Sequence, residues 1–393
     1  MNKAILHIDV QSFILENLNK DIRSLSLKKS PFPSVSPAEL AGQIDSRKRC
    51  EHKLPLWFRT PFIYYPPKLS VEQSSSEIAA RYKAGLVEGD SVIDLTGGFG
   101  VDSHFFALKC PDVTHCELNQ EISDIAAYNS KTLGSKIYFH PGDGIDYLRR
   151  SGKTYSTIYI DPSRRVESKK VFMLRDCEPD VVSNLRLLRE HSSLLMIKAA
   201  PLLDIQSTIS ELKAVSSIHV ISIKNECKEL LFLIKDKDAG TDPPITCALF
   251  GTEKDKTYTF RISEERTFHI SSYSDPLNYI YEPDVALLKA GCFKLITRDF
   301  HVSKIQQHTH LYTSRTLNGS FPGRKFKVKS TWHYGSFLKS GGIKKANLIC
   351  RNFPLSPEAL KKKLGISDGG DEYLLFCTSN TNELLVLHCE RVL

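Results

Sequence analysis

The stretch that decides the fold is residues 91–105, SVIDLTGGFGVDSHF. An apolar segment ends in Asp94, glycine occupies three of the next positions (Gly97, Gly98 and Gly100), and a second apolar segment follows. Glycine is costly in entropy, so its density here indicates a backbone that needs positive φ or close approach to another group. A strand that ends in a glycine-rich turn and leads into a helix is typical of the nucleotide site of open α/β sheets. We therefore predict that this turn wraps a ligand.

Strand-like and helix-like segments alternate from this turn onward. Strands are predicted at 91–95, 113–117, 136–140, 157–161 and 193–198, and helices at 101–109, 122–133, 145–150 and 181–189. This alternation predicts a doubly wound α/β fold, a parallel sheet with helices on both faces. Two further strands, 219–223 and 229–234, are separated by only five residues. Because a parallel crossover needs a dozen residues or more, the last strand must run antiparallel.

The segments on either side of this core have a different character. Residues 1–70 are predicted to be helical, with a capping box at Ser36 and Glu39 and a proline-rich linker at 61–70. A second capping box, at Ser74 and Glu77, opens the predicted core of residues 71–272. Near the end of this core, 245–250 and 257–262 are expected to form an added hairpin. Later helices predicted at 283–291 and 356–366 indicate one or two small α+β units.

The composition is that of an ordinary globular protein, 41% hydrophobic and 25% charged. No apolar run reaches the roughly 20 residues of a membrane helix, and the N-terminus lacks a signal-peptide pattern, so we expect a cytoplasmic protein without membrane contact. The ten cysteines include no CxxC pair, which argues against a disulfide framework and against a zinc ribbon. The histidines form no HExxH motif, and we expect no metal site.

Acidic residues follow successive predicted strands. Asp94, Glu117, Asp143 and Asp161 each lie at or just after a strand end. The turn matches neither GxGxxG nor GxxxxGK[ST], so phosphate recognition is disfavoured. Carboxylates accept hydrogen bonds from ribose hydroxyls and ammonium groups, which S-adenosylmethionine carries. The alternative is that Asp143 and Asp161 only cap helices.

The order of these motifs resembles the class I S-adenosylmethionine-dependent methyltransferases. The whole chain is similar to a bacterial family of such enzymes with a C-terminal THUMP-like domain. The stretches that carry this resemblance are LSVEQSSSEIAARYKA, VIDLTGGFGVDSHFFA, YIDPSRR, DCEPDV, NECKELLFL, YEPDVALLKAGCF and NFPLSPEALKKKLGISDGGDEYLLF. The resemblance implies a Rossmann-like methyltransferase sheet, a ferredoxin-like unit at 273–320, a THUMP-like RNA-binding domain at 321–393, and structured RNA (tRNA or rRNA) as substrate.

The resemblance also implies roles for individual residues. The implied S-adenosylmethionine-binding residues are Gln73, Ser75, Asp94, Thr96, Gly98, Gly100, Glu117, Leu118, Asp143 and Gly144. Asp161 and Pro162 match the catalytic tetrad of enzymes that methylate exocyclic amino groups. Ser163 and Arg164 depart from that tetrad, which usually has a second proline and an aromatic residue. The aromatic platform for a base is therefore missing unless Tyr159 or another segment supplies it.

A window of residues 300–357 contains no Asp or Glu and holds ten Lys or Arg, against a net charge of +8 for the whole chain. Such a one-sided field suits a polyanion. The predicted RNA-contacting residues are Arg164, Arg165, Arg324, Lys325, Lys327 and Lys329. In RKFKVK the pattern predicts a strand with Phe326 buried and the three lysines outward, so that the lysines meet phosphates. Arg164 and Arg165 could instead pair with Glu167 and Asp176, and the window could be a solvated face.

The sequence therefore predicts a methyltransferase that modifies a nucleotide in structured RNA. One alternative is a methyltransferase of a small molecule or a protein, which the acid-free window disfavours. Another is a catalytically inactive RNA-binding protein, which the change at Ser163 and Arg164 favours and the intact acidic set disfavours. The sequence leaves open the oligomeric state, the RNA and the methylated atom.

Overall fold

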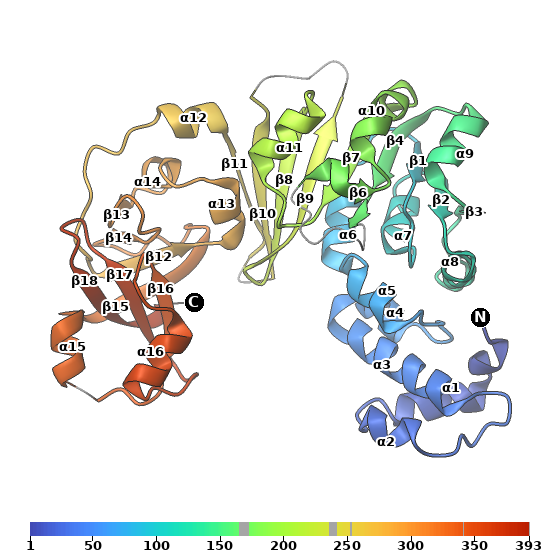
Figure 1. Ribbon diagram of the computed structural model, residues 1–393, viewed down its shortest axis with the longest axis horizontal. Helices are drawn as coiled ribbons and strands as arrows, with labels where there is room; N and C mark the ends of the chain where they lie inside the picture. Colours follow the sequence, from blue (N-terminus) through green and yellow to red (C-terminus); the bar gives the residue numbers. More distant parts are fainter. Residues whose placement is uncertain (165–172, 236–241, 252–253, 341, 393) are drawn as a thin grey trace. The chain divides into compact units, whose positions relative to one another are not determined.

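The computed structural model describes residues 1–164, 173–235, 242–251, 254–340 and 342–392 (Figure 1). The chain divides into two compact units. The first comprises Met1–Ser216 and Leu231–Thr241, and the second comprises Ser217–Leu230 and Asp242–Leu393. The predicted domain bounds at residues 70, 272 and 320 stay predictions.

The first unit begins with short helices, as predicted. They are η1 (Lys3–Leu6), α1 (Ile8–Glu16), α2 (Ile22–Ser26), α3 (Pro37–Lys53), α4 (Pro55–Arg59), α5 (Lys68–Gln73) and α6 (Glu77–Ala84). The capping box of Ser36 and Glu39 is confirmed at the start of α3. The box predicted at Ser74 is wrong, because Ser74 ends α5 and Ser76 caps α6 by accepting from the Ala79 amide at 3.2 Å.

The proline-rich segment at 61–70 is not an exposed linker. Tyr64 and Tyr65 are buried, and the Gln43 side chain donates to the Tyr65 carbonyl at 2.6 Å and accepts from its amide at 2.9 Å. The amide of Gln43 thus pairs with an extended backbone as a neighbouring strand would. The tertiary contact, which proline content does not report, makes residues 63–66 part of the core.

A parallel sheet forms the rest of the first unit. Its parallel strands are β1 (Ser91–Asp94), β2 (Asp112–Glu117), β3 (Tyr138–Pro141), β4 (Tyr155–Ile160) and β7 (Ser192–Ala199). The helices between them are α7 (Val101–Ala107), α8 (Gln120–Thr132), α9 (Gly144–Ser151) and α10 (Val181–Glu190), with α11 (Ile205–Leu212) after β7. The strand order is β9–β7–β4–β1–β2–β3, in which β9 (Glu226–Ile234) contributes its second half to this unit. Figure 1 shows β1, β2, β4 and β7 side by side with α9 and α10.

In the second unit, the strand order β11–β10–β8–β9 continues from the first half of β9. Strand β8 (Ser217–Ile223) turns into β9 through Lys224 and Asn225, whose φ values of 53° and 62° suit a two-residue hairpin. The reversed strand predicted from the short connection is therefore confirmed. Strands β10 (Pro244–Phe250) and β11 (Lys256–Arg261) form the predicted hairpin, with β10 parallel to β8.

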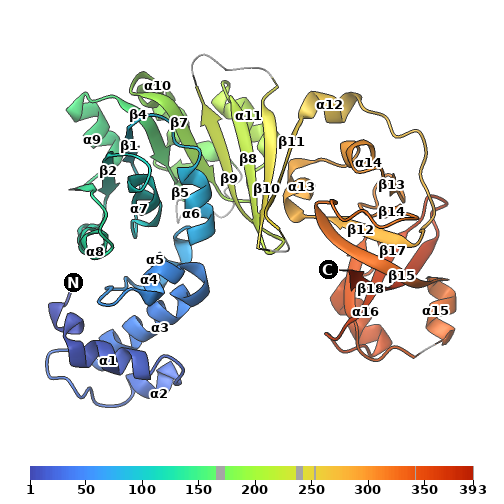
Figure 2. The same cartoon turned by 180° about the vertical axis from the view of Figure 1, so that it is seen from behind.

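A second sheet follows helix α12 (Ile262–Thr267). Its order is β13 (Ser303–Lys304), β14 (Tyr312–Ser314), β12 (Tyr279–Pro283), β15 (Gly323–His333), β18 (Leu384–Val392), β17 (Glu372–Thr378) and β16 (Asn347–Arg351) (Figure 2). Helix α13 (Val285–Ala290) packs on β8 and β10, whereas α15 (Tyr334–Ser340) and α16 (Pro357–Leu364) pack on the second sheet; α14 (Leu295–Asp299) follows α13 in the chain. Two apolar clusters form its core, one around Phe326 and one around Phe376.

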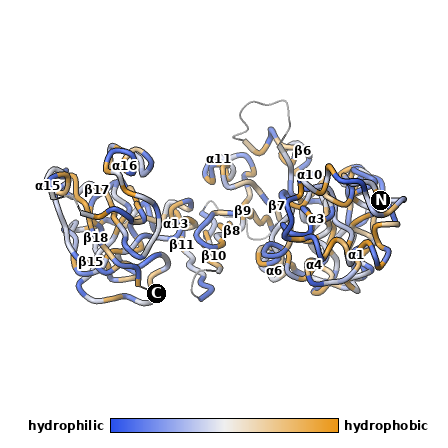
Figure 3. Tube along the Cα trace, turned by 90° about the horizontal axis from the view of Figure 1, so that it is seen from below, coloured by the Kyte–Doolittle hydropathy of each residue, from blue (hydrophilic) through white to orange (hydrophobic). Residues whose placement is uncertain are grey.

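Hydropathy follows this arrangement. Helix α16 is drawn largely in blue in Figure 3, which agrees with its three consecutive lysines, while Leu360 on the same helix is buried in the core. Across the described part of the chain, no helix combines the length and the apolar character needed to cross a membrane.

Candidate active site

The glycine turn after β1 needs each glycine for a different reason. Gly98 and Gly100 have φ values of +54° and +80°, which favour glycine, and Gly100 is the N-cap of α7. Gly97 is required by packing, because a Cβ there would lie 2.0 Å from the His115 ring. The amide of Gly97 donates to the Cys116 carbonyl at 2.7 Å, so the turn is fastened to the end of β2.

Asp94 lies at the carboxyl end of β1 and is 1% exposed. Its two oxygens accept hydrogen bonds from the Thr96 amide at 3.1 Å and from the Ser103 hydroxyl at 2.7 Å. Burial, and after it the charge of Asp102, raises the pKa of Asp94 to about 7. This carboxyl group therefore changes charge near neutral pH.

Ser103 and His115 hold Asp94 in place through a series of hydrogen bonds. Ser103 uses its one proton on Asp94, so the His115 Nδ1, 3.0 Å away, donates to the Ser103 oxygen. Burial lowers the pKa of His115 to about 3, so the ring is neutral and its single proton lies on Nδ1. Ser103 and His115 thus hold Asp94 and Gly97 in a fixed relation.

Glu117 closes the end of β2. One of its oxygens accepts from the Gly98 amide at 2.8 Å and the other from the Asn119 amide at 2.8 Å. The next residue, Leu118, leaves 75% of its surface exposed. An acidic group held by the glycine turn and an exposed apolar side chain therefore lie next to each other.

The end of β4 joins this group through Asp161. Its amide donates to the Thr96 hydroxyl at 2.7 Å, which ties β4 to the glycine turn. Its carboxylate forms an ion pair of 2.5 Å with the Lys198 ammonium from the end of β7. The predicted residues Asp94, Thr96, Gly98, Glu117 and Asp161 are thus brought together at one edge of the sheet.

A buried ionic network lies beside this edge. Lys83, fully buried, is 2.8 Å from the Asp102 carboxylate, 2.5 Å from the Ser75 hydroxyl and 3.1 Å from the Tyr159 hydroxyl. Ser75 and Tyr159 both donate to Asp102, at 2.8 and 3.0 Å. Burial acts to raise the pKa of Asp102, but the charges of Lys83 and Lys198 outweigh it and keep that pKa lowered. Tyr159 is 1% exposed, so the expectation that it could supply a stacking platform is wrong.

The remaining predicted residues occupy varied positions. Gln73 is exposed at the end of α5. Asp143 caps α9 by accepting from the Asp146 amide at 2.8 Å, and Gly144 is buried where a Cβ would come within 2.5 Å of the Leu95 carbonyl. Arg164 lies in the two-residue strand β5 (Ser163–Arg164), which pairs with β6 (Cys177–Glu178).

Two predictions near β5 fall outside what the structure describes. These are Arg165 and its alternative partner Glu167.

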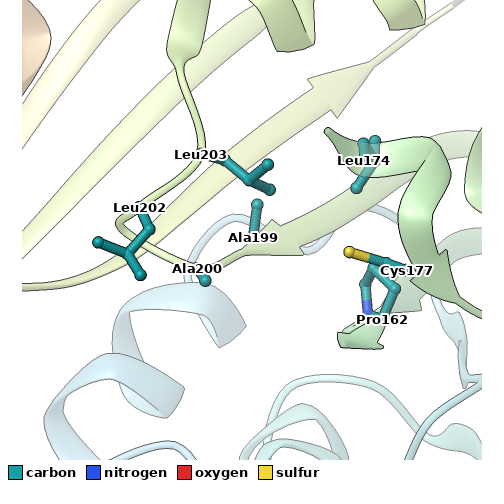
Figure 4. A pocket seen from close by; sticks show the side chains of 7 residues that line it. All are labelled: Pro162, Leu174, Cys177, Ala199, Ala200, Leu202 and Leu203. Carbon is teal, nitrogen blue, oxygen red and sulfur yellow. The ribbon is translucent and has the colours of Figure 1, made fainter. Parts of the chain in front are cut away.

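An apolar pocket includes Pro162, the residue that follows Asp161 in the chain (Figure 4). It is lined by Pro162, Leu174, Cys177, Ala199, Ala200, Leu202 and Leu203. Figure 4 shows the side chains of Leu203, Leu174 and Cys177 directed toward a common space, with Leu202 on the outer side. The pocket therefore lies between the ends of β4 and β7 and is lined by apolar side chains.

The basic strand β15 differs from its prediction. Lys325 is only 3% exposed, so the expected outward direction is wrong for this residue. Arg324 pairs with the buried Glu282, and Lys329 donates to both oxygens of Glu372 at 2.8 and 3.0 Å. The window is free of acids in sequence, but strands β12, β17 and β18 bring acids beside it.

The sequence reasoning missed several residues that the fold places at the site: Lys83, Asp102, Ser103, His115 and Lys198. Asp102 follows the glycine turn by two residues and Ser103 by three, so their proximity to Asp94 could have been inferred from the predicted helix. Lys83 and Lys198 come from distant segments, and nothing local in their surroundings indicates an ion pair.

The comparisons with known proteins agree with this architecture. A family model for a ferredoxin-like domain matches residues 279–322, and one described as THUMP domain-like matches residues 323–391. No curated protein matches the chain. The strand order, the reversed β9 and the glycine turn after β1 define the Rossmann-like sheet of class I methyltransferases.

A crystal structure of a "putative methyltransferase" from Porphyromonas gingivalis W83 is similar over 100% of this chain and 99% of that chain, with 31% identity and a TM-score of 0.87. The chain belongs to the family of that protein.

Two other solved structures are similar over part of the chain. An S-adenosylmethionine-dependent methyltransferase from Agrobacterium tumefaciens is 17% identical, over 40% of this chain and 60% of that chain, with a TM-score of 0.31. A tRNA (uracil-54, C5)-methyltransferase from Pyrococcus abyssi is 16% identical, over 43% and 39%, with a TM-score of 0.29. Similarity at this level carries no argument about activity.

Proposed function

We propose that this protein is an S-adenosylmethionine-dependent methyltransferase that modifies a nucleotide in structured RNA. The observation that carries the proposal is the set of carboxylates Asp94, Glu117 and Asp161 around the glycine turn. Ligands of open α/β sheets bind outside the carboxyl ends of the strands, where these groups lie. Family membership with the Porphyromonas gingivalis protein supports the methyltransferase assignment.

The donors and acceptors present fit S-adenosylmethionine. Each oxygen of Glu117 accepts one amide hydrogen bond and keeps further capacity for ribose hydroxyls. The exposed Leu118 offers an apolar surface for an adenine ring, with Asp143 on the next strand end. The positive φ of Gly98 and Gly100 leaves the backbone of the turn open to a ligand.

Bound S-adenosylmethionine supplies an electrophilic methyl group on a sulfonium. The protein's part is to orient the acceptor, because proximity provides much of the acceleration of such a displacement. Asp161 is held by the Thr96 hydroxyl through its amide and by Lys198 through its carboxylate. From this position its carboxylate can accept a hydrogen bond from an N–H or O–H of the acceptor and fix the direction of attack.

The RNA part of the proposal rests on two supports. The C-terminal residues match a THUMP-like model, and the chain carries a net charge of +8. A base inside a helix must be extruded before its atoms can be methylated. Pro162, Leu202 and Leu203 would then form the wall that it meets, in place of an aromatic platform.

The first experiment is calorimetric titration of S-adenosylmethionine and S-adenosylhomocysteine into the wild-type protein, Asp94→Asn and Glu117→Ala. Each variant should bind at least tenfold more weakly, since a charge-assisted hydrogen bond contributes about 1.5–3 kcal/mol. The matched control is Glu121→Ala, an exposed acid on α8 that pairs with the N-terminal amine at 3.2 Å. An unchanged affinity in both site variants would contradict the cofactor site.

The second experiment measures transfer of a labelled methyl group to bulk tRNA and rRNA. Methyl incorporation that requires Asp161 would support the proposal. Cofactor binding without transfer to any RNA fraction would favour the alternative of an inactive RNA-binding protein. Transfer to protein or small-molecule extracts alone would refute the RNA substrate and leave the methyltransferase assignment intact.

A further inference from the structure

A groove in the second unit collects four basic side chains. They are Lys224, Lys256, Arg324 and Arg391, and the groove has a volume of about 370 Å³. Asp284 also lines it, as does Gly251. Only Arg324 lies inside the acid-free window of residues 300–357, so the other three were not predicted from it.

Strand pairing explains how these distant residues meet. The parallel strands β8 and β10 end together at Ile223 and Phe250, and the Lys224 amide donates to the Phe250 carbonyl at 2.8 Å. Strand β11 pairs with β10, and its first residue, Lys256, lies opposite Leu249 near the end of β10. In the second sheet, Arg324 begins β15 and Arg391 lies near the end of its antiparallel neighbour β18, where it pairs with Phe326. The two sheets of the second unit therefore present cations to one groove.

Two of the four cations are held by the protein itself. The ammonium of Lys256 lies 3.5, 3.4 and 3.2 Å from the carbonyls of Gly319, Ser320 and Phe321. Arg324 forms an ion pair with Glu282, which is buried and also pairs with Arg351 at 2.6 Å. These contacts fix the two side chains in place, and Glu282 compensates the charge of Arg324.

The other two cations are exposed, and no acid in the described part of the chain pairs with either of them. These are Lys224 and Arg391. Asp284 is 2% exposed, and its carboxylate accepts from the Ala286 amide at 2.9 Å. The groove lining thus has four cations and one buried carboxylate, Asp284, while Glu282 beside the groove compensates Arg324. The exposed Lys224 and Arg391 leave it positively charged, which suits an anionic ligand.

We propose that this groove binds phosphate groups of the RNA backbone. The inference rests on the proposed function, since it takes RNA as the substrate. Lys and Arg bind phosphates through charge and, for Arg, through two parallel hydrogen bonds. Such contacts position a nucleic acid without reading its sequence. The groove thus adds affinity for RNA that Lys325, which is buried, and Lys329, which pairs with Glu372, do not supply.

The test is binding of fluorescently labelled bulk tRNA and rRNA to the full chain between 50 and 200 mM salt. The groove variant is Lys224→Glu with Arg391→Glu, which leaves the structural contacts of Lys256 and Arg324 intact. The matched control is Lys28→Glu with Lys29→Glu, two exposed lysines that give the same change of charge. All three proteins should melt at the same temperature.

We expect the groove variant to bind RNA at least tenfold more weakly at 50 mM salt. Its slope of log affinity against log salt should become shallower by about two, one for each lost phosphate contact. The control should stay within twofold of the wild type. Equal weakening by the two double variants would contradict RNA binding in the groove, but it would not contradict RNA as the substrate.

Titration of inorganic phosphate separates the two sources of this anion. If the wild type bound inorganic phosphate but no RNA, the groove would be a small-anion site and the proposal would be overturned. That result would also remove the RNA substrate, whereas the titration of S-adenosylmethionine would still decide the cofactor independently. RNA binding that resists millimolar inorganic phosphate at constant ionic strength supports the polyanion.

Discussion

The edge of the first sheet and strand β15 of the second make an instructive pair. In both, the sequence has a row of charged residues from which a binding surface is predicted. At the sheet edge Asp94, Glu117 and Asp161 meet around the glycine turn, as predicted. On β15, Lys325 is buried and Lys329 pairs with Glu372. The acids at the sheet edge therefore lie in the surroundings that the sequence predicts, whereas Lys325 and Lys329 of β15 do not.

The difference comes from what brings the charges together. Strand ends of a parallel sheet meet because of the chain's own alternation of strands and helices, which the sequence displays. The surroundings of β15 depend on which strands pair with it, and β12 and β18 come from segments before and after it in the chain. A charge pattern along one strand therefore does not report the net charge of the surface it enters.

The largest expected effect concerns the buried network that supports the sheet edge. Lys83→Met leaves Asp102 without its cation in the interior and should lower the free energy of unfolding by about 3–5 kcal/mol. Lys48→Met is the control, because its pair with Glu51 is exposed and should contribute no more than about 1 kcal/mol. The shift of the urea unfolding midpoint measures both, and equal shifts would contradict the buried role of Lys83.

The next effect separates binding from catalysis at the same edge. Asp161→Asn should reduce methyl transfer roughly 100-fold or more, because the acceptor loses its orienting carboxylate, while S-adenosylmethionine affinity stays within threefold. Single-turnover transfer and calorimetry give the two quantities. The control is Asp146→Asn, whose pair with Arg149 is exposed. A loss of cofactor affinity equal to the loss of rate would assign Asp161 to binding alone.

A smaller effect follows from the raised pKa of Asp94, about 7. A cationic ligand favours the ionised carboxylate, so below pH 7 its binding must release a proton, and affinity should rise about tenfold per pH unit. Above pH 7 the affinity should level off. Calorimetry from pH 5.5 to 8.5 measures the curve, and Asp94→Asn should flatten it. The other acids that raise this pKa are Asp102 and Asp161, so their variants should displace the curve to lower pH.

The raised pKa of Asp94 in the folded protein also determines whether its contribution to stability rises or falls with pH. Because it lies above the ordinary value of 3.8, the folded protein holds this proton more tightly than the unfolded chain. The contribution of Asp94 to stability should therefore fall as pH rises from about 4 to about 7. An Asp94→Asn variant that kept the full pH dependence of the melting temperature in this window would exclude that contribution.

The smallest expected effect concerns the lysines of strand β15. Lys329→Gln should change RNA affinity less than twofold, since Glu372 already neutralises this lysine. Lys327→Gln should have the larger effect, because its ammonium is 3.9 Å from Glu390 and its side chain is 58% exposed. Salt-dependent RNA binding of both variants decides the order, and a larger effect of Lys329→Gln would contradict its neutralisation by Glu372.

The sequence by itself determined the class of fold and the place of the site. Three local features carried this information: the alternation of strands and helices, the five-residue gap before the last strand, and the glycine turn. Local backbone preferences depend on neighbouring residues and not on tertiary contacts. The proximity of Asp94, Glu117 and Asp161 could be predicted because the strand ends of a parallel sheet converge. The N-cap of α6 was misplaced by two residues, since three consecutive serines offer equivalent caps and packing chooses among them.

Only the tertiary structure decided how the charges are compensated. Lys83 with Asp102, Lys198 with Asp161, and Glu282 with Arg324 join residues far apart in the chain. It also gathered the cations of the groove from the β8–β9 turn, β11, β15 and β18. Electrostatic energy depends on distance and burial, and neither quantity is defined until the segments have packed.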